Sequence, residues 1–317
     1  MKKLMIGYFI LGLISSPSFA NIRSGLNTGP LAVQYIMSDP PLPKTHAKKG
    51  EHFGEVKPGF IYGSFTGNYE NVTEKGYMSG PTMAGSYGHA LSDKLSLFGW
   101  IVGSKIEGKA RSDFQNSGLS FSQADDISVE FYNLSAGVSY LVYSSENKDS
   151  FVSVFGGAYI PIYRFSEKFI NYDTNNPAEA EIEASHTFTG LLLGVQWQKQ
   201  IHEKWGIGSF LILADTFGSN DFMNPFGDTG ECRQFKVKRL ISGSSNGVQE
   251  VDRECAGGDS NEFWFDTMIG GIGFTVEYKP WDLKTNLVSP FLNRYIFEIF
   301  YEEMEPEFIY LSVSFGI

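Results

Sequence analysis

Few residues in this sequence have the types and spacing that catalysis requires. Ser185 and His186 supply a nucleophile and a base by type. Adjacent residues of a strand point to opposite faces of a sheet, however, so these two side chains would not meet. The nearest carboxylate before His186 is that of Glu183, and the chain holds only five histidines. An acidic pair, Asp125-Asp126, stands just before an alternating apolar segment. We predict no catalytic residues.

The two cysteines, Cys232 and Cys255, lie in one polar segment, 218–262. Their spacing suits neither a zinc site nor a CxxC redox motif. Proteins exported to an oxidising space keep disulfides. We therefore expect a disulfide that closes a loop, with two free thiols as the alternative.

The segment between the two cysteines is basic in an otherwise acidic chain. One interpretation is that it binds lipopolysaccharide phosphates, or folds over a pore mouth and biases ion selection. The other, which we favour, is a solvated and stapled surface loop. The basic cluster consists of Arg233, Lys236, Lys238, Arg239 and Arg253.

The opposite charge gathers at 302–307, which reads Glu-Glu-Met-Glu-Pro-Glu and predicts a tight acidic hairpin. Such a tip could hold Ca²⁺ or Mg²⁺ between lipid headgroups. Flexible acidic tips without a fixed oxygen cage bind weakly, so we expect a solvated tip. No metal site and no cofactor are predicted.

The stretch 129–163 predicts a long β-hairpin around a turn at 144–149. One face of its first strand is small and polar, at Asn133, Ser135, Gly137 and Ser139. The other face is apolar, at Tyr132, Leu134, Ala136, Val138, Tyr140 and Val142. Alternation of this kind is the mark of a strand with two different environments.

Two folds can accommodate such strands. A soluble sandwich buries the apolar face against a second sheet. A membrane barrel turns that face to lipid, with aromatic residues at the headgroup level and polar residues in the lumen. Because the polar face carries residues too small to pack as a core, we predict an all-β, up-and-down antiparallel transmembrane β-barrel.

The same patterns predict about ten strands, with eight or twelve as alternatives, and long extracellular loops. The predicted strands are 58–66, 77–89, 95–106, 127–143, 151–165, 186–200, 205–217, 263–279, 294–302 and 308–317. The gaps 67–76, 107–126, 166–185, 218–262 and 303–307 alternate with tight turns near 92–93, 144–149 and 202–204. Long loops at one end and short periplasmic turns at the other are typical of outer-membrane barrels. The gap 280–293 is longer than this rule expects.

The termini and the charge narrow the class further. Residues 1–20 combine Lys2 and Lys3, an apolar run and a small-residue site at Ser18-Phe19-Ala20, so we expect a cleaved signal peptide. Residues 21–56 are expected to form a periplasmic N-terminal segment that tucks under or into the barrel, with a disordered tail as the alternative. Residues 57–317 are expected to form the barrel. The net charge is −11, and 23 basic against 36 acidic residues leave −13 without the two lysines of the signal. That balance excludes nucleic acid as a partner.

The chain ends on an amphipathic strand, in which Ile309, Leu311, Val313 and Phe315 alternate with polar or small residues. In this it resembles the bacterial outer-membrane β-barrels, a broad class matched by pattern rather than motif over nearly all of the chain after residue 20. The resemblance implies the outer membrane as location, and outer-membrane lipid, lipopolysaccharide and the barrel assembly machinery as partners. The final Ile317 departs from the aromatic residue that is usual in the class. The surface partner stays unknown.

Some barrels of this class are enzymes. Omptin-like proteases use a pair of Asp residues and an Asp/His pair at the extracellular rim. Asp125-Asp126 and His186 resemble part of that set, but an Asp companion for His186 is missing. The comparison therefore favours a chain that is not an enzyme, with a rim protease or a lipid hydrolase as the weaker alternative.

Parity along the strands predicts which side chains face the lumen. They are Asn133, Ser135, Ser139, Gln196, Gln198, Thr275, Glu277 and Glu298. Neutral and acidic groups predominate, which would favour cations. Barrels of about eight strands are filled by side chains and open porins need about sixteen, so ten strands lie near the filled end. Phe98 and Trp100 lie opposite Leu97 and Ile101, so the sequence leaves open whether these two aromatics block the path.

Two functions remain. The first, which we prefer, is a small passive channel, porin-like, for ions or small solutes. The second is a structural or adhesive surface protein that uses the segments 107–126 and 218–262 as its contact surface. A rim hydrolase comes third.

Overall fold

The computed structural model describes residues 32–69, 72–116, 119–171, 178–217, 231–233, 235–240, 248–253, 263–265, 268–290 and 304–316. Strands dominate these ranges, and the helical pieces within them are a turn at 32–37 and the 3-10 helix η1 (Lys279–Trp281). No helix of the described part has the length and apolar character needed to cross a membrane.

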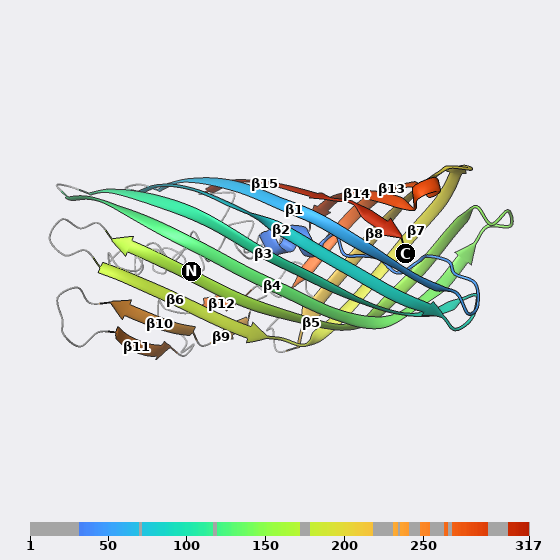
Figure 1. The fold of residues 1–317 in the computed structure, drawn as a ribbon, viewed down its shortest axis with the longest axis horizontal. Coiled ribbons are helices and arrows are strands. Elements are labelled where there is room, and N and C mark those ends of the chain that lie inside the picture. The colour runs from blue at the N-terminus through green and yellow to red at the C-terminus, as the bar shows by residue number, and fades with distance from the viewer. Residues whose placement is uncertain are drawn as a thin grey trace, which may run out of the picture.

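Ten antiparallel strands of the described chain close into a barrel, as the alternation predicted (Figure 1). They are β1 (His52–Tyr69), β2 (Val72–Ala90), β3 (Leu95–Asn116), β4 (Leu119–Ser144), β5 (Ser150–Asn171), β7 (Gly190–His202), β8 (Trp205–Thr216), β13 (Ile269–Tyr278), β14 (Leu283–Pro290) and a last strand split into β15 (Met304–Ser312) and β16 (Ser314–Gly316). Pairing of β5 with β7 and of β1 with β15 and β16 closes the ring. A single closed sheet excludes the two-sheet sandwich.

Part of the sheet continues beyond the closed ring. β6 (Ala178–Thr187) pairs with the part of β5 that β7 leaves free, and β10 (Phe235–Leu240) and β11 (Val248–Arg253) extend it from there. β9 (Glu231–Arg233) and β12 (Phe263–Phe265) pair separately. Figure 1 shows β6, β10 and β11 at the end of the barrel opposite the short turns.

The connections 91–94, 145–149, 203–204 and 279–282 lie at one end of the barrel, which we name the turn end; the end towards which β6, β10 and β11 lie is the extended end (Figure 1). The connections 91–94, 145–149 and 203–204 confirm the predicted tight turns. The predicted long gap 280–293 is wrong, because η1 and Asp282 turn the chain directly into β14. Among the outward residues of β14, Thr285 and Ser289 are polar, so its alternation was not visible. The predicted strand 294–302 lies outside the described residues.

Three predicted loops, 67–76, 107–126 and 166–185, are largely strand. β3 runs to Asn116 and β4 starts at Leu119, and the two pair along this whole length. In this part of the barrel the outer face is charged and the inner face is apolar. Lys105, Glu107 and Lys109 point outward, while Ile106 and Ala110 are buried inside. The prediction failed because it required an apolar outer face.

The predicted acidic hairpin at 302–307 is also wrong in its second half. Residues 304–307 belong to β15 and pair with 64–67 of β1. A ladder is held by backbone hydrogen bonds, so the sequence Met-Glu-Pro-Glu at 304–307 does not prevent strand pairing at this end of the barrel.

The outer face of the closed ring carries an apolar belt of exposed side chains. It includes Leu97, Ile101, Leu134, Val138, Val154, Leu191, Leu193, Ile272, Phe274, Ile309 and Leu311. Tyrosines and tryptophans of the same outer surface include Tyr62, Tyr87, Tyr132, Tyr140, Trp205 and Trp281. An apolar outer face on a closed barrel is the surface that a membrane barrel presents to lipid.

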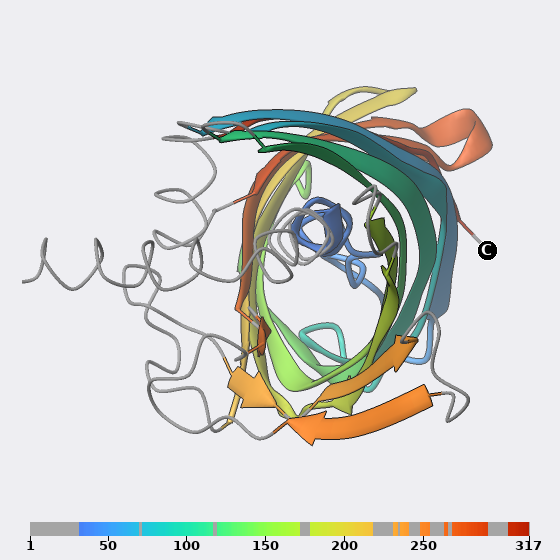
Figure 2. The ribbon, with the colours of Figure 1, turned by 90° about the vertical axis from the view of Figure 1, so that its left-hand side faces the viewer.

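The N-terminal part of the described chain lies inside the barrel. Figure 2, a view along the barrel, shows the helical turn 32–37 within the ring of strands. From there the chain runs to the turn end and enters β1 at His52. We name residues 32–51 the plug. Within the predicted N-terminal segment 21–56, residues 32–51 thus lie in the lumen and 52–56 belong to the first strand.

Candidate functional site

Local sequence explains the shape of the plug. The helical turn ends at Ser38, whose amide donates to the carbonyl of Gln34 at 2.9 Å. Asp39 precedes a proline, which disfavours the helical region for it. The run 40–43, Pro-Pro-Leu-Pro, then holds the backbone extended with few amide donors to satisfy. This segment can therefore cross the lumen without pairing to a strand.

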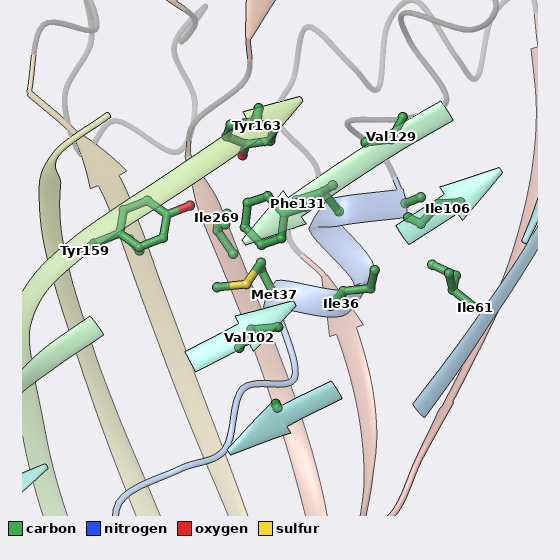
Figure 3. Close-up of a cluster of buried hydrophobic side chains, with 14 of the residues drawn as sticks. Ile36, Met37, Ile61, Val102, Ile106, Val129, Phe131, Tyr159, Tyr163 and Ile269 are labelled. Atoms are coloured by element: carbon green, nitrogen blue, oxygen red, sulfur yellow. The ribbon is translucent and has the colours of Figure 1, made fainter. Parts of the chain in front are cut away.

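The helical turn packs through apolar side chains. Val33, Ile36 and Met37 are buried in one cluster with the inner faces of the strands (Figure 3). Figure 3 places Ile36 and Met37 beside Val102 and Phe131. Burial of each such side chain contributes roughly 1.5–3 kcal/mol, which holds the turn against the wall.

A buried aspartate fixes the plug to three elements. The Asp39 carboxylate lies 2.5 Å from Nζ of Lys57 in β1. It also accepts hydrogen bonds from Asn286 Nδ2 in β14 and Ser312 Oγ in β15, both at 2.6 Å. The same Lys57 ammonium donates to the Asp39 carbonyl at 2.9 Å. Asp39 is thus the main polar anchor of the plug.

Further contacts fix the plug at both sides of Asp39. The Gln34 side chain donates to the carbonyl of Met268, and Gln196 Nε2 donates to the carbonyl of Pro43 at 2.8 Å. Ser38 lies so close to Gly271 that a Cβ at this glycine would come within 2.6 Å of the Ser38 Cβ. The wall is therefore shaped for the plug, with a glycine where the two approach most closely.

At the turn end, Glu51 holds the exit of the plug. Its carboxylate accepts from Lys44 Nζ at 2.6 Å and from the Lys48 amide at 2.8 Å. Partial burial acts to raise the pKa of Glu51, but these two hydrogen bonds outweigh it and lower the pKa below its ordinary value. Gly50, at φ 81°, supplies the left-handed conformation that turns the chain into β1.

Between the plug and the wall, a cavity of about 350 Å³ opens near the turn end. Residues 42–45 of the plug form one side, and β7, β8, β13 and β14 form much of the other. Its acidic lining residues are Glu51, Glu55, Glu277 and Asp282, and its lysines are Lys44 and Lys284. The cavity is therefore polar and has an acidic balance.

Two interactions order the charges in this cavity. Lys284 Nζ lies 3.3 Å from the buried carboxylate of Glu55. Gln198 Nε2 donates to Glu277 Oε2 at 2.6 Å, so an amide rather than an ammonium group contacts this carboxylate oxygen. A fixed carboxylate bonded to an amide attracts cations, because the amide does not neutralise it.

The predicted lumen residues fall into two groups. Asn133, Ser135 and Ser139 are buried on the inner face of β4. The other predicted lumen residues that the structure describes line the cavity; they are Gln196, Gln198, Thr275 and Glu277. Glu298 lies outside the described residues.

The sequence analysis missed the residues that carry most of the site's charge. Asp39 stands in a segment without periodicity, and its burial depends on the barrel around it. Glu55 and Lys57 alternate with the exposed Val56. That alternation would have placed both in the lumen had the first strand been started before residue 58. Lys284 and Asn286 belong to the missed strand β14.

Phe98 and Trp100 lie inside the barrel, which settles the face that the sequence left open. Their rings stack with centroids 5.1 Å apart, and both meet Phe155 edge to face. Leu97 and Ile101 are exposed on the outside. These aromatics belong to the same buried cluster as the helical turn 32–37 of the plug.

The candidates for rim catalysis are not brought together. His186 pairs in register with Tyr163, which pairs with Phe131, whereas Asp126 lies five residues further along β4. At about 3.3 Å per residue, that offset is about 16 Å. Ser185 is exposed and His186 is half-buried, as expected for neighbours on opposite faces.

All residues of the basic cluster except Arg233 belong to β10 and β11, at the extended end of the large sheet. Lys236 and Lys238 of β10 stand in register between acidic residues of both neighbouring strands, Glu183 and Glu181 on β6 and Asp252 and Glu250 on β11. Arg239 belongs to β10, Arg253 to β11, and Arg233 to β9. Cys232 also belongs to β9, while Cys255 lies outside the described residues.

Among the described residues, no group of histidine, cysteine, aspartate and glutamate side chains has an arrangement that could hold a metal ion. The charged groups of the lumen are instead joined to each other and to amides and hydroxyls.

A closed antiparallel barrel with an apolar belt outside, a polar cavity inside and short turns at one end has the architecture of the bacterial outer-membrane β-barrels. No protein-family profile and no curated protein sequence matches the chain.

Solved structures with a similar fold come from the same class. The outer membrane protease OmpT from Escherichia coli shares 5% identity over 87% of this chain and 99% of its own, with a TM-score of 0.43. The transport unit of the autotransporter AIDA-I from Escherichia coli shares 10% over 92% of this chain and 98% of its own, with a TM-score of 0.41. The outer membrane protein OprG from Pseudomonas aeruginosa shares 10% over 73% and 97%, with a TM-score of 0.32. Likeness at this level concerns the fold alone.

Proposed function

We propose that the protein is an outer-membrane channel for small solutes, closed by its own plug. The observation that carries this proposal is the way the plug is held beyond its apolar turn 32–37: by a polar anchor at Asp39 and beside a polar cavity, rather than by apolar packing along its whole length. A barrel that served only as an anchor would gain more stability from an apolar filling.

The energetics of the anchor support a closure that can open. A buried ion pair gives little net stability, because desolvation offsets most of the attraction between the charges. Such pairs serve better to fix one arrangement among several. Lys57 and Asp39 therefore define a closed position of the plug without making it permanent.

Conductance in planar bilayers tests the channel. We expect the full-length mature protein to be mostly closed, and Asp39→Asn or Lys57→Met to raise the open probability several-fold. Lys49→Met is the matched control for loss of a lysine of the plug, because Lys49 is exposed and its side chain takes no part in the contacts of Asp39 or Glu51. Closed traces for both anchor variants, with a folded barrel by circular dichroism, would refute the proposal.

A second function, attachment through the extended end, is favoured by a different observation. There the strands project with charged outer residues, including Lys105, Glu107, Lys109 and Asp126. This alternative expects no conductance from any plug variant and loss of a surface interaction when 218–262 is removed.

The membrane partners follow from the outer surface. We propose that the apolar belt meets outer-membrane lipid and that the basic cluster meets lipopolysaccharide phosphates. We also propose that the barrel assembly machinery recognises the last strand through β16. Reconstitution with and without lipopolysaccharide, comparing wild type with Lys236→Gln, tests the second of these contacts.

A further inference from the structure

The inner wall towards the extended end is apolar, although the lumen of a membrane barrel is usually polar. Inward residues of β3, β4 and β5 on this wall are buried and belong to one cluster with the helical turn of the plug. They include Val102, Ile106, Ile127, Val129, Phe131 and Phe165. If the plug moves, this surface becomes an apolar chamber.

Three polar side chains interrupt the apolar wall. Trp100 Nε1, Ser104 Oγ and Asn133 Oδ1 are buried, and none has a hydrogen-bond partner among the described residues. Asn133 uses only its Nδ2, which donates to Ser135 Oγ at 3.0 Å. Buried polar atoms without partners cost free energy, so an arrangement that keeps three of them together asks for an explanation.

The strand register brings these three side chains to one place. On β3, Trp100 and Ser104 flank Val102, and Val102 is paired with Asn133 on β4. Diagonal neighbours across an antiparallel pair are about 7–8 Å apart, within reach of one small molecule that lies over both strands. Val102 itself lies beside the plug residue Met37 in Figure 3.

An apolar chamber with a few convergent polar groups is the usual composition of a small-molecule site. The available groups also define the ligand. The indole of Trp100 can only donate, the free oxygen of Asn133 can only accept, and the hydroxyl of Ser104 can do both. A ligand hydroxyl complements this set, because it donates and accepts at once.

We propose that the chamber filled by the turn 32–37 is the binding site of the channel for a mainly apolar solute that carries a hydroxyl group. Trp100, Ser104 and Asn133 bind the hydroxyl, and the apolar wall binds the rest. The inference rests on the proposed channel function, since the solute occupies the space that the plug vacates. Plug and solute therefore compete, and a weaker anchor at Asp39 strengthens solute binding.

Equilibrium dialysis against protein in lipid nanodiscs tests this site, with empty nanodiscs as the correction for partition into lipid. The ligands are 2-naphthol and 2-methylnaphthalene, which differ by a hydroxyl in place of a methyl group. We expect one saturable site that prefers 2-naphthol by about tenfold. Asp39→Asn should tighten the binding of both ligands while it leaves their ratio unchanged.

Substitutions on the wall localise the preference. In Asn133→Val and Trp100→Phe, the ratio of affinities should fall to about twofold or less. Ser104→Ala is the smallest of the three changes. It still tests the site if Asn133→Val or Trp100→Phe prevents folding. Ser96→Ala is the matched control, a buried serine on the same face of β3 nearer the turn end, and should keep the ratio.

The outcomes separate the two proposals. No saturable binding, or a preference that survives Asn133→Val, Trp100→Phe and Ser104→Ala, overturns the site. Conductance from Asp39→Asn without ligand binding overturns the site and leaves the channel. Saturable, hydroxyl-selective binding without conductance supports the site and overturns the channel.

Discussion

Lys57 binds Asp39 twice, through the carboxylate at 2.5 Å and through the carbonyl oxygen at 2.9 Å. Both side chains are buried, one in the first strand of the barrel and the other in the segment that fills it. The contact links the fold of the wall to the position of the plug. Both contacts depend on one ammonium, so a change at Lys57 removes both together.

Lys57→Met should lower the free energy of unfolding by about 3–5 kcal/mol, because it leaves Asp39 charged and buried without a cation. Asp39→Asn in the same chain should recover part of this loss, since the amide keeps hydrogen bonds to Asn286 and Ser312 without a charge. Urea unfolding in lipid vesicles measures both. Strictly additive losses in the double variant would show that the two residues are not coupled in the native barrel.

Gly271→Ala should displace the plug, because the added methyl group would lie 2.6 Å from Ser38 Cβ and 3.1 Å from the Ser38 carbonyl oxygen. The expected result is faster proteolysis of the plug and a higher open probability in bilayers. Gly85→Ala is the control, since a methyl group there has its nearest contact at 3.8 Å. If both variants behave alike, plug displacement is not the cause.

The comparison of sequence with structure shows where pattern is informative. Alternation at 132–142 predicted the outward face of β4 correctly, because lipid selects apolar side chains at every second position. Beyond the belt, Lys105 and Glu107 of the neighbouring strand β3 face water and Ile106 faces inward, so β3 was predicted as a loop from residue 107 onward. Periodicity also has nothing to say about Asp39, whose environment is made by strands far away in the chain.

The strand count was right, although one of the ten strands lies where a connection was predicted. Residues 283–290 were taken as a connection because polar Thr285 and Ser289 occupy outward positions, while Lys284 and Asn286 face the cavity. A position of the N-terminal segment inside the barrel was one of the alternatives that the sequence left open, but the contacts of the plug escaped the analysis for a physical reason. The side chains of a segment that crosses a closed barrel fit the local contacts inside that barrel. The sequence of such a segment therefore shows no regular alternation of apolar and polar residues.

Leu193→Arg should hinder assembly into membranes, because Leu193 is 55% exposed and belongs to the apolar belt. A charged residue facing lipid at the midplane costs about 2–4 kcal/mol. Tyr77→Arg is the matched control: Tyr77 is exposed too, but it pairs with Lys109 where the outer face is already charged. The yield of folded protein in vesicles measures the difference, and equal yields would contradict a lipid-facing belt.

Charge in the cavity should set ion preference once the plug is released. In an Asp39→Asn background, Glu277→Gln should lower the preference for cations and Lys284→Met should raise it, because the two groups have opposite charge beside the same cavity. Reversal potentials in a salt gradient measure the preference. Shifts of the same sign in both variants would mean that ions take a path outside this cavity.

Acid should loosen the plug at its exit, where the lowered pKa of Glu51 reflects hydrogen bonds that only the folded chain provides. A carboxylate with a depressed folded pKa stabilises the fold above its unfolded pKa, and this contribution disappears as the pH falls through the folded value. Wild-type protein should therefore show more openings below about pH 4.5 than at pH 7, measured in bilayers. Glu51→Gln should open more often at pH 7 and lose part of the acid response. An unchanged acid response in this variant would assign the effect to other carboxylates of the lumen.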